Sequence, residues 1–407
     1  MSSISIAAYF PFAGVKVVRQ NVHTINSLIR IQPDGRFHPR CHDCLRPATT
    51  VHSAGHRRSV RDLTLADRRV WLDIEYRKVW CEHCGGSRVE HLSFCDASRR
   101  VTHRLARYIY ELCKVLTVEE VARHLDLDPK TVRAVDHHFL QEEFGRTDYA
   151  GLRILAIDEI ALRKGRYGYM TVVLDQLTGR VVWMGQGHDK GTLDAFFAGM
   201  TPAEKSGIEA VALDMWNAYI NRVQHHCPQA KIVFDLFHLV DAFGKVIDKV
   251  RRREYQQADR AGKAVISGSR YLLLKNQENL TAPEQDRLDE LLELNRTLNQ
   301  VYILKDDLKQ IYTATSRRQA KHRLDTWCAM AQRIDHWLVK RFAGRLRSYE
   351  YGILNHCEHG IGTSPLEGVN NKIKLIKRRA YGYHDSAYFA LKVKQAFPGK
   401  KTTTFLG

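Results

Sequence analysis

The chain has 407 residues, more than one hydrophobic core usually holds, so we expect several domains. Its hydrophobic content of 44% suits a folded protein, and it has no apolar run of about 18 residues, so no membrane span is expected. Lysine and arginine total 63 against 45 acidic residues, which gives a formal net charge of +18. This charge favours a polyanionic partner, most simply nucleic acid; the alternative is a basic protein that has no such partner.

Cysteines in the N-terminal part are spaced as in metal-binding Cys-x-x-Cys turns. They form two pairs, Cys41 with Cys44 and Cys81 with Cys84. Each pair places two thiolates on a tight turn, and two such turns supply the tetrahedral sulfur set of structural zinc, with a redox pair as the alternative. The alternating segment Val70–Trp80 predicts a strand between the pairs, so we expect residues 1–97 to form a zinc ribbon. Cys95 and several histidines could substitute as ligands: His42, His52, His56, His83 and His91.

The next segment, residues 98–148, is predicted to be helical. Thr117 and Glu120 make a capping box that opens one helix, and Asp128 with Pro129 begins the next. Two short helices joined by a tight turn describe a helix-turn-helix that binds DNA, with an ordinary helical hairpin as the alternative. The side chains expected to contact DNA are Lys130, Thr131 and Arg133.

Strand periodicity begins after this helical segment. The apolar run Ile154–Ile157 ends abruptly at Asp158, and Ile208–Leu213 ends in the same way at Asp214. Residues 149–240 predict a three-strand meander, a helix, a fourth strand, a helix and a fifth strand, which is the order of a ribonuclease-H-like fold. The first and fourth strands of that fold are parallel neighbours, so the two aspartates would lie together at one sheet end and could share a metal ion. The alternative is that they only solvate the sheet edge.

Helices are predicted to follow the fifth strand. Asp235 and His238 come first, and they could either tune the acidic site or begin the next helix. Residues 241–357 are charged and helical, and we expect an all-helical insertion there, in which Arg251–Arg253 is either a solvated face or a DNA contact. The buried stripe of the insertion should comprise Leu288, Leu291, Leu292, Leu298, Val301 and Tyr302.

The last predicted helix lies in residues 358–407 and carries Glu367 near its start. Polar residues follow on the same face, at helical spacing: Asn370, Asn371, Lys374 and Arg378. The acid could bind metal while the amide and the cations hold phosphates. Two strand-end aspartates and one helical glutamate provide the carboxylates that hold two magnesium or manganese ions about 3.5–4 Å apart in phosphoryl transfer.

Four sequence blocks make the chain resemble the bacterial insertion-sequence transposases of the ISL3 family. They are Leu155–Glu159, Leu213–Tyr219, Lys231–His238 and Glu367–Gly382, and the last is the most specific. The cysteine knuckles and the helix-turn-helix also fit that family, so the resemblance spans nearly the whole chain. It implies a DDE transposase acting on the inverted ends of its own element, with Asp158, Asp214 and Glu367 as the metal-binding triad.

These features together predict a cytoplasmic, bacterial DNA transposase with two catalytic magnesium or manganese ions and one structural zinc. One ion would activate water to nick double-stranded DNA, and the 3′-hydroxyl would then attack a new phosphodiester. Because transposition unites two element ends, we expect a homodimer or larger assembly on DNA. The start of the chain, Met1–Ser5, does not resemble a signal peptide, which is consistent with the predicted location. The alternatives are a zinc-dependent DNA-binding regulator and a structure-specific nuclease or resolvase that cuts without joining.

Overall fold

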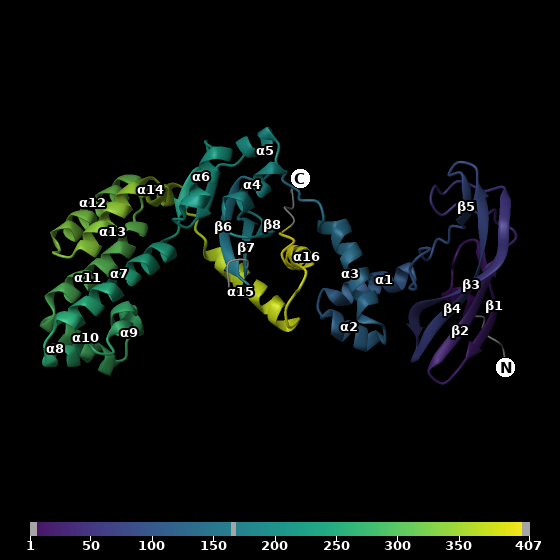
Figure 1. Ribbon diagram of the computed structural model, residues 1–407, viewed down its shortest axis with the longest axis horizontal. Helices are drawn as coiled ribbons and strands as arrows, with labels where there is room; N and C mark the ends of the chain where they lie inside the picture. Colours follow the sequence, from purple (N-terminus) through teal and green to yellow (C-terminus); the bar gives the residue numbers. More distant parts are fainter. Residues whose placement is uncertain (1–5, 164–167, 401–407) are drawn as a thin grey trace, which may run out of the picture. The chain divides into compact units, whose positions relative to one another are not determined.

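The structure is a computed structural model that describes residues 6–163 and 168–400, so Met1–Ser5 lies outside the described residues. The chain divides into two compact units, one up to Leu140 and one from Gln141, and each is described by itself (Figure 1). Within the described ranges, no helix is both long enough and apolar enough to cross a membrane.

A five-stranded sheet makes up most of the first unit. Its strands are β1 (Val15–Val22), β2 (Asn26–Pro33), β3 (Thr50–Leu65), β4 (Arg68–Cys81) and β5 (Gly86–Val89), after a short 3-10 helix η1 (Ile6–Tyr9). They run in the order β1-β2-β4-β3, and β5 pairs with the end of β4. Alternate residues of β4, such as Leu72 and Ile74, are fully buried, as a strand with one core face requires. The strand predicted between the cysteine pairs is part of β4, but the four further strands make this a larger sheet than a simple ribbon.

Three helices complete the first unit: α1 (His103–Cys113), α2 (Val118–Leu125) and α3 (Pro129–Phe144). The predicted capping box is confirmed, because Thr117 and Glu120 bond reciprocally at the start of α2. Asp126 ends α2 in the left-handed conformation, and the Asp128 carboxylate accepts a hydrogen bond from the Lys130 backbone N–H at 2.7 Å as α3 begins. The predicted helix-turn-helix therefore forms around an apolar core.

The second unit contains a mixed sheet. Its strands are β6 (Ile154–Ala161), β7 (Tyr169–Asp175), β8 (Arg180–Gln186), β9 (Ala210–Leu213) and β10 (Lys231–Phe234), in the order β10-β9-β6-β7-β8. The meander β6-β7-β8 is antiparallel, whereas β9 is parallel to both β6 and β10. This confirms the prediction that the first and fourth strands are parallel neighbours, and it places β6 at the centre of the sheet.

Helices cover both faces of this sheet (Figure 1). One core joins the sheet to α4 (Lys190–Ala198) and α6 (Asn217–His226), which flank the short α5 (Pro202–Ser206), and it includes Leu155 and Ile157 of β6. The other core includes Ala156 of β6 and joins the sheet to α15 (Ser364–Arg379) and α16 (Ser386–Ala396). The alternation along β6 therefore directs the side chain of Asp158 toward α15.

A helical region lies between β10 and α15, as predicted. Its helices are α7 (Leu236–Gln257), α8 (Arg260–Ile266), α9 (Arg270–Leu274), α10 (Ala282–Leu294), α11 (Arg296–Tyr312), α12 (Arg317–Arg333), α13 (Trp337–Ser348) and α14 (Glu350–His359), with a 3-10 turn η3 (Gln277–Asn279). The predicted stripe is buried except for Leu292, which is partly buried. Asn355 of α14 donates a hydrogen bond to the Ile232 carbonyl at 2.8 Å, and the Tyr312 hydroxyl donates to the Phe234 carbonyl at 3.0 Å. These bonds fix the region to the edge strand β10.

Candidate active site

The two aspartates that follow the apolar runs are brought together by strand register. Ala156 of β6 lies opposite Ala212 of β9 in the parallel pairing. Asp158 and Asp214 come two residues later, so the same register makes them neighbours, as predicted. The prediction that both end a strand is wrong for Asp158: Asp214 follows the last residue of β9, but β6 continues to Ala161 because its pairing with β7 extends beyond the shorter β9. Both side chains are half-buried.

The environment of the aspartates disfavours two unpaired negative charges. Burial raises the pKa of Asp158, and repulsion from Asp214 raises it further against the opposing charge of His238. Burial likewise raises the pKa of Asp214, while His238 and Arg345 act in the opposite direction. One carboxylate oxygen of Asp214, Oδ1, is buried without a hydrogen-bond partner among the described residues. An oxygen-rich, charge-crowded site with an unsatisfied carboxylate oxygen fits a divalent cation such as magnesium.

Glu159 is a third acid beside the aspartates, and the sequence analysis did not assign it a role. Burial, followed by repulsion from Asp214 and Asp158, raises the pKa of Glu159 to about 7. It pairs across the sheet with Thr171, whose hydroxyl lies 2.7 Å from the hydroxyl of Tyr219. The acidic doublet at the end of an apolar strand was the available sequence signal for this residue.

Helix α15 carries Glu367 to the same end of the sheet. Asn370, one turn after Glu367, donates a hydrogen bond from Nδ2 to Oδ2 of Asp158 at 2.8 Å. The Asn370 side chain is buried and its Oδ1 has no partner among the described residues, whereas Glu367 is exposed. The other predicted phosphate contacts on α15, Asn371, Lys374 and Arg378, are also exposed. The structure therefore joins α15 to Asp158 through an amide and leaves its acid and cations accessible.

The three predicted acids do not form a compact ligand set. In the described residues, a group of four cysteines has all its ligand atoms within 4.8 Å of one another, but Asp158, Asp214 and Glu367 do not form such a group. A metal held by all three would require the exposed Glu367 side chain to swing toward the aspartates.

Asp235 has a structural position between two helices of the site. Its Oδ1 accepts a hydrogen bond from the Phe237 backbone N–H at 2.6 Å, which caps α7. Its Oδ2 accepts one from the backbone N–H of Thr363, the residue that precedes α15. The buried carboxylate of Asp235 thus ties the start of α7 to the start of α15. His238, in the first turn of α7, has a different position because its charge acts on both Asp158 and Asp214.

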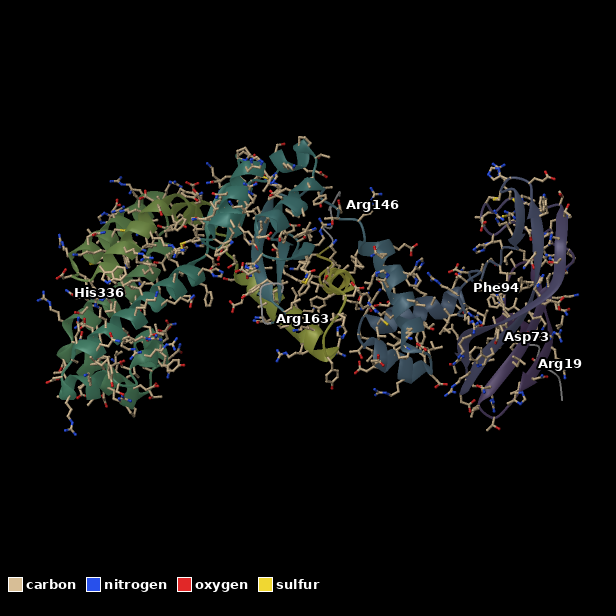
Figure 2. The ribbon with its side chains drawn as sticks, in the orientation of Figure 1. Arg19, Asp73, Phe94, Arg146, Arg163 and His336 are labelled. Carbon is tan, nitrogen blue, oxygen red and sulfur yellow. The ribbon has the colours of Figure 1, made fainter. Side chains whose placement is uncertain are left out.

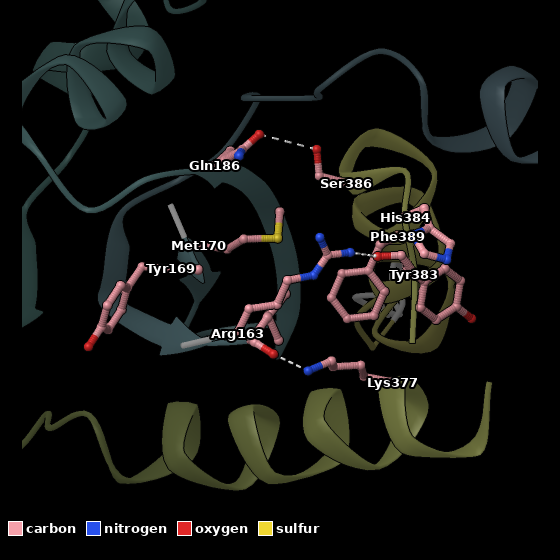
Figure 3. Close-up of a pocket in the computed structure, with 11 residues that line it drawn as sticks. Arg163, Tyr169, Met170, Gln186, Lys377, Tyr383, His384, Ser386 and Phe389 are labelled. Atoms are coloured by element: carbon pink, nitrogen blue, oxygen red, sulfur yellow. Dashed lines mark hydrogen bonds between the residues drawn. The ribbon is translucent and has the colours of Figure 1, made fainter. Parts of the chain in front are cut away.

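The C-terminal half of α15 is fastened to the β6–β7 hairpin beside a pocket of 110 Å³ (Figure 3). Lys377 donates a hydrogen bond from Nζ to the Leu162 carbonyl, and Arg163 donates from Nη2 to the Tyr383 carbonyl. The hydroxyl of Ser386 lies 3.4 Å from Oε1 of Gln186. The bond of Lys377 holds α15 against the sheet, and the other two bonds hold the chain that follows α15 and the start of α16. This pocket therefore supports the helix that carries Glu367.

The four predicted zinc ligands come together in the first unit. The Sγ atoms of Cys41 and Cys84 are 3.9 Å apart, and those of Cys44 and Cys81 are 3.5 Å apart. A tetrahedron with metal–sulfur bonds of about 2.3 Å has edges of about 3.8 Å, so the spacing fits zinc. The Cys84 backbone N–H bonds to the sulfur of Cys81 and lowers its pKa to about 7, which favours a thiolate ligand.

The residues considered as substitute zinc ligands lie outside this cluster. Cys95 is buried, and its sulfur accepts a hydrogen bond from Nη2 of Arg58 at 3.0 Å. His42 and His91 instead pair with each other, with ring centroids 6.1 Å apart. The four paired cysteines therefore supply the complete sulfur set by themselves.

The predicted DNA contacts of the helix-turn-helix begin α3. Lys130 and Arg133 are exposed, and Thr131 is half-buried. Val132 and Val135, on the opposite face, are buried in the core of the three helices. The first turn of α3 therefore presents its polar side chains to solvent, as a recognition helix requires.

Comparisons with known proteins cover both the helix-turn-helix and the second unit. A transposase family, DDE_Tnp_ISL3, matches residues 155–393, and the helix-turn-helix domain of transposase family ISL3 matches residues 90–140. The chain is 42% identical to the transposase for insertion sequence element IS1001 of Bordetella parapertussis, over 88% of this chain and 89% of that protein. It is 27% identical to the transposase for insertion sequence element IS1557 of Mycobacterium tuberculosis, over 88% of this chain and 85% of that protein.

Proposed function

Because the chain belongs to the ISL3 family of DDE transposases, we propose that it binds the terminal inverted repeats of its own insertion sequence and catalyses both strand cleavage and strand transfer. The observation that carries the proposal is the position of Asp158, on β6, beside Asp214, which follows the parallel strand β9, with Asp158 bonded to the helix that carries Glu367. The relatives are named as transposases of insertion sequences, which supports the same activity here.

Asp158, Asp214 and Glu367 would hold two magnesium or manganese ions in a ribonuclease-H-like domain. Such ions, when bound, activate a water or a 3′-hydroxyl and stabilise the charge on the leaving oxygen. The chain's own residues would position the reactants: Asn370 fixes the carboxylate of Asp158, while Lys374 and Arg378 contact phosphates that flank the reacting one. Because these side chains bind before the chemistry, they lower its entropic cost.

The first unit would recognise the element ends. Lys130, Thr131 and Arg133 of α3 would contact DNA, and one structural zinc held by the four cysteines would stabilise the adjoining sheet as a zinc ribbon. We also propose the five-part division into residues 1–97, 98–148, 149–240, 241–357 and 358–407. Because transposition unites two ends, the active form would be a homodimer or larger assembly on double-stranded DNA.

The test is an assay of the purified full chain with magnesium on a labelled duplex of an element end. We expect a nick that leaves a 3′-hydroxyl at the end, followed by joining of that hydroxyl to a second DNA. Cleavage without joining would indicate a nuclease or resolvase. Specific binding without cleavage, with either magnesium or manganese, would indicate a DNA-binding regulator and contradict the proposal.

A further inference from the structure

A cleft of 420 Å³ opens beside Asp214, between the sheet and the helical region. Its walls are the segment that follows β9, the first half of α7 and the start of α13. Helix α13 begins after His336, which Figure 2 labels and whose ring nitrogen accepts a hydrogen bond from the Leu338 backbone N–H. The cleft is continuous with the acidic site because Asp214 and His238 line it. A ligand in it would therefore adjoin the reacting phosphate.

Cations line both helices of the cleft. Lys245 and Lys249 are one turn apart on α7, and Arg341 and Arg345 are one turn apart on α13; all four are exposed. Lys245 forms an ion pair with Asp241 at 2.7 Å. In the described part of the chain, the other three cations form no ion pair with a carboxylate. The cleft also contains the acids Asp214 and Asp241, so its four cations leave it with net positive charge for a polyanion.

Two tryptophans stand at the same cleft with their rings half in solvent. Trp216, two residues after Asp214, is 46% exposed, and Trp337, at the start of α13, is 52% exposed. The Arg341 guanidinium lies 5.7 Å from the centre of the Trp337 ring, and the His188 ring is 6.4 Å from that of Trp216. Large aromatic surfaces beside cations are the elements of a stacking platform for nucleic-acid bases.

Exposed tryptophan rings beside cations favour binding of an unpaired DNA strand over binding of a duplex. Base faces are available for stacking only when bases have left the double helix, whereas cations alone would serve either form. The volume is also that of a pocket for a ligand of nucleotide size, since sites for small molecules measure about 300–1,000 Å³. We propose that this cleft holds unpaired nucleotides of one DNA strand next to the cleavage site, with Trp216 and Trp337 stacking on bases and the cations contacting phosphates.

This inference rests on the proposed function, because it assumes that the reacting DNA lies at Asp214. It adds that the element end is locally unwound when the strand is cut. Unpairing has a free-energy cost, and stacking on the tryptophans would offset it.

The test measures DNA binding by the full chain carrying Asp158→Asn, so that no DNA is cut. The probes are an oligothymidylate of about 20 nucleotides, long enough to fill one single-strand site, and a blunt element-end duplex. Replacing both tryptophans, Trp216→Ala with Trp337→Ala, should raise the Kd for oligothymidylate by about 10-fold or more. The Kd for the duplex should change by less than about 2-fold, because the helix-turn-helix still binds it.

Three further variants make the result specific. Trp216→Phe with Trp337→Phe keeps aromatic faces and should restore most of the affinity, which a merely structural role would not explain. Tyr271→Ala removes an aromatic side chain that is even more exposed, elsewhere in the helical region, and should change neither Kd. Arg341→Gln should weaken oligothymidylate binding and reduce its salt dependence, whereas Arg318→Gln on α12 should not.

Two outcomes would overturn the inference. Unchanged oligothymidylate binding in the double alanine variant would show that the tryptophans do not stack on bases, and an equal loss on both probes would show a duplex-binding surface. Cleavage and joining by the unmodified protein are measured separately. If the unmodified protein cleaves and joins DNA but the tryptophans prove dispensable, the proposed function stands and this inference fails. If the protein binds oligothymidylate through the tryptophans but neither cleaves nor joins DNA, the proposed function fails and only the single-strand site remains.

Discussion

The four-cysteine cluster and the acidic site differ in how they would hold a metal ion. The cysteines lie on two short turns, and their sulfurs already stand at the separations of a tetrahedral site. The acids come from β6, the end of β9 and α15, and their oxygens are not yet gathered into one ligand set. A closed sulfur site suits a metal that stabilises a fold, whereas an open carboxylate site leaves positions for water and DNA.

The largest expected effect comes from neutralising one of the three acids proposed to be catalytic. Asp158→Asn, Asp214→Asn and Glu367→Gln each keep the side-chain shape and remove one negative charge, so two adjacent divalent ions would lose the charge that offsets their repulsion. We expect cleavage to fall by about 10³-fold or more, with end binding and folding unchanged, in a strand-cleavage assay paired with a mobility-shift assay. Substantial cleavage by Glu367→Gln would remove that residue from the triad.

The corresponding change in the sulfur site should affect structure instead of chemistry. Cys41→Ser with Cys81→Ser should abolish zinc binding and destabilise the first unit by several kcal/mol, because metal binding contributes directly to folding. Zinc content should fall from about one ion per chain, and end binding should weaken with it. Cys95→Ser is the matched control: that cysteine is buried outside the cluster, so the variant should keep its zinc. Zinc that survives the double substitution would exclude these ligands.

A smaller effect is expected from the amide that joins the two parts of the acidic site. Asn370→Ala removes the hydrogen bond to Asp158 and should slow cleavage by about 10–100-fold, as is usual for groups that orient metal ligands. Raising the magnesium concentration should recover part of the rate, because the carboxylate is still present. Leu375→Ala, at an exposed position of the same helix with no assigned contact, is the control for a general effect on α15. Equal losses in both variants would contradict a specific role for Asn370.

The smallest effect concerns stability without metal. Burial raises the pKa of Asp214 above that of an exposed aspartate, so its ionised form costs stability at any pH above the folded-state pKa. Asp214→Asn should therefore raise the melting temperature of the metal-free protein at neutral pH by about 2–4 °C, or about 1 kcal/mol. Magnesium should raise the melting temperature of the unmodified protein more than that of the variant. A lower melting temperature for metal-free Asp214→Asn would show that the carboxylate is structural.

Local sequence signals predicted much of the fold. The capping box at Thr117 and the aspartate before Pro129 defined the helix-turn-helix, because caps act on adjacent backbone groups. Apolar runs that end in Asp158 and Asp214 predicted two parallel strands, since a strand buried on both faces is apolar throughout. The long strand β3 was not predicted, because its many exposed residues interrupt the apolar alternation.

The contacts that assemble the site could not be predicted in the same way. The bonds of Asn370 to Asp158 and of Asp235 to Thr363 join residues far apart in the chain, and no periodicity encodes which distant group a polar side chain meets. The cleft between α7 and α13 was missed for the same reason. Its cations are spaced like those of any solvated helix, and only the packing of the two helices brings them beside Asp214.

The bond between Asn370 and Asp158 spans 212 residues, and this separation sets an order of events during synthesis. Ribosomes add about 5–20 residues per second, so about 10–40 s pass between the appearance of the first acid and that of the helix that completes its surroundings. The first unit ends at Leu140 and can fold well before then. If the first unit binds element ends as proposed, a nascent or interrupted chain would occupy those ends without cutting them, and incomplete products would compete with the finished enzyme for its own DNA.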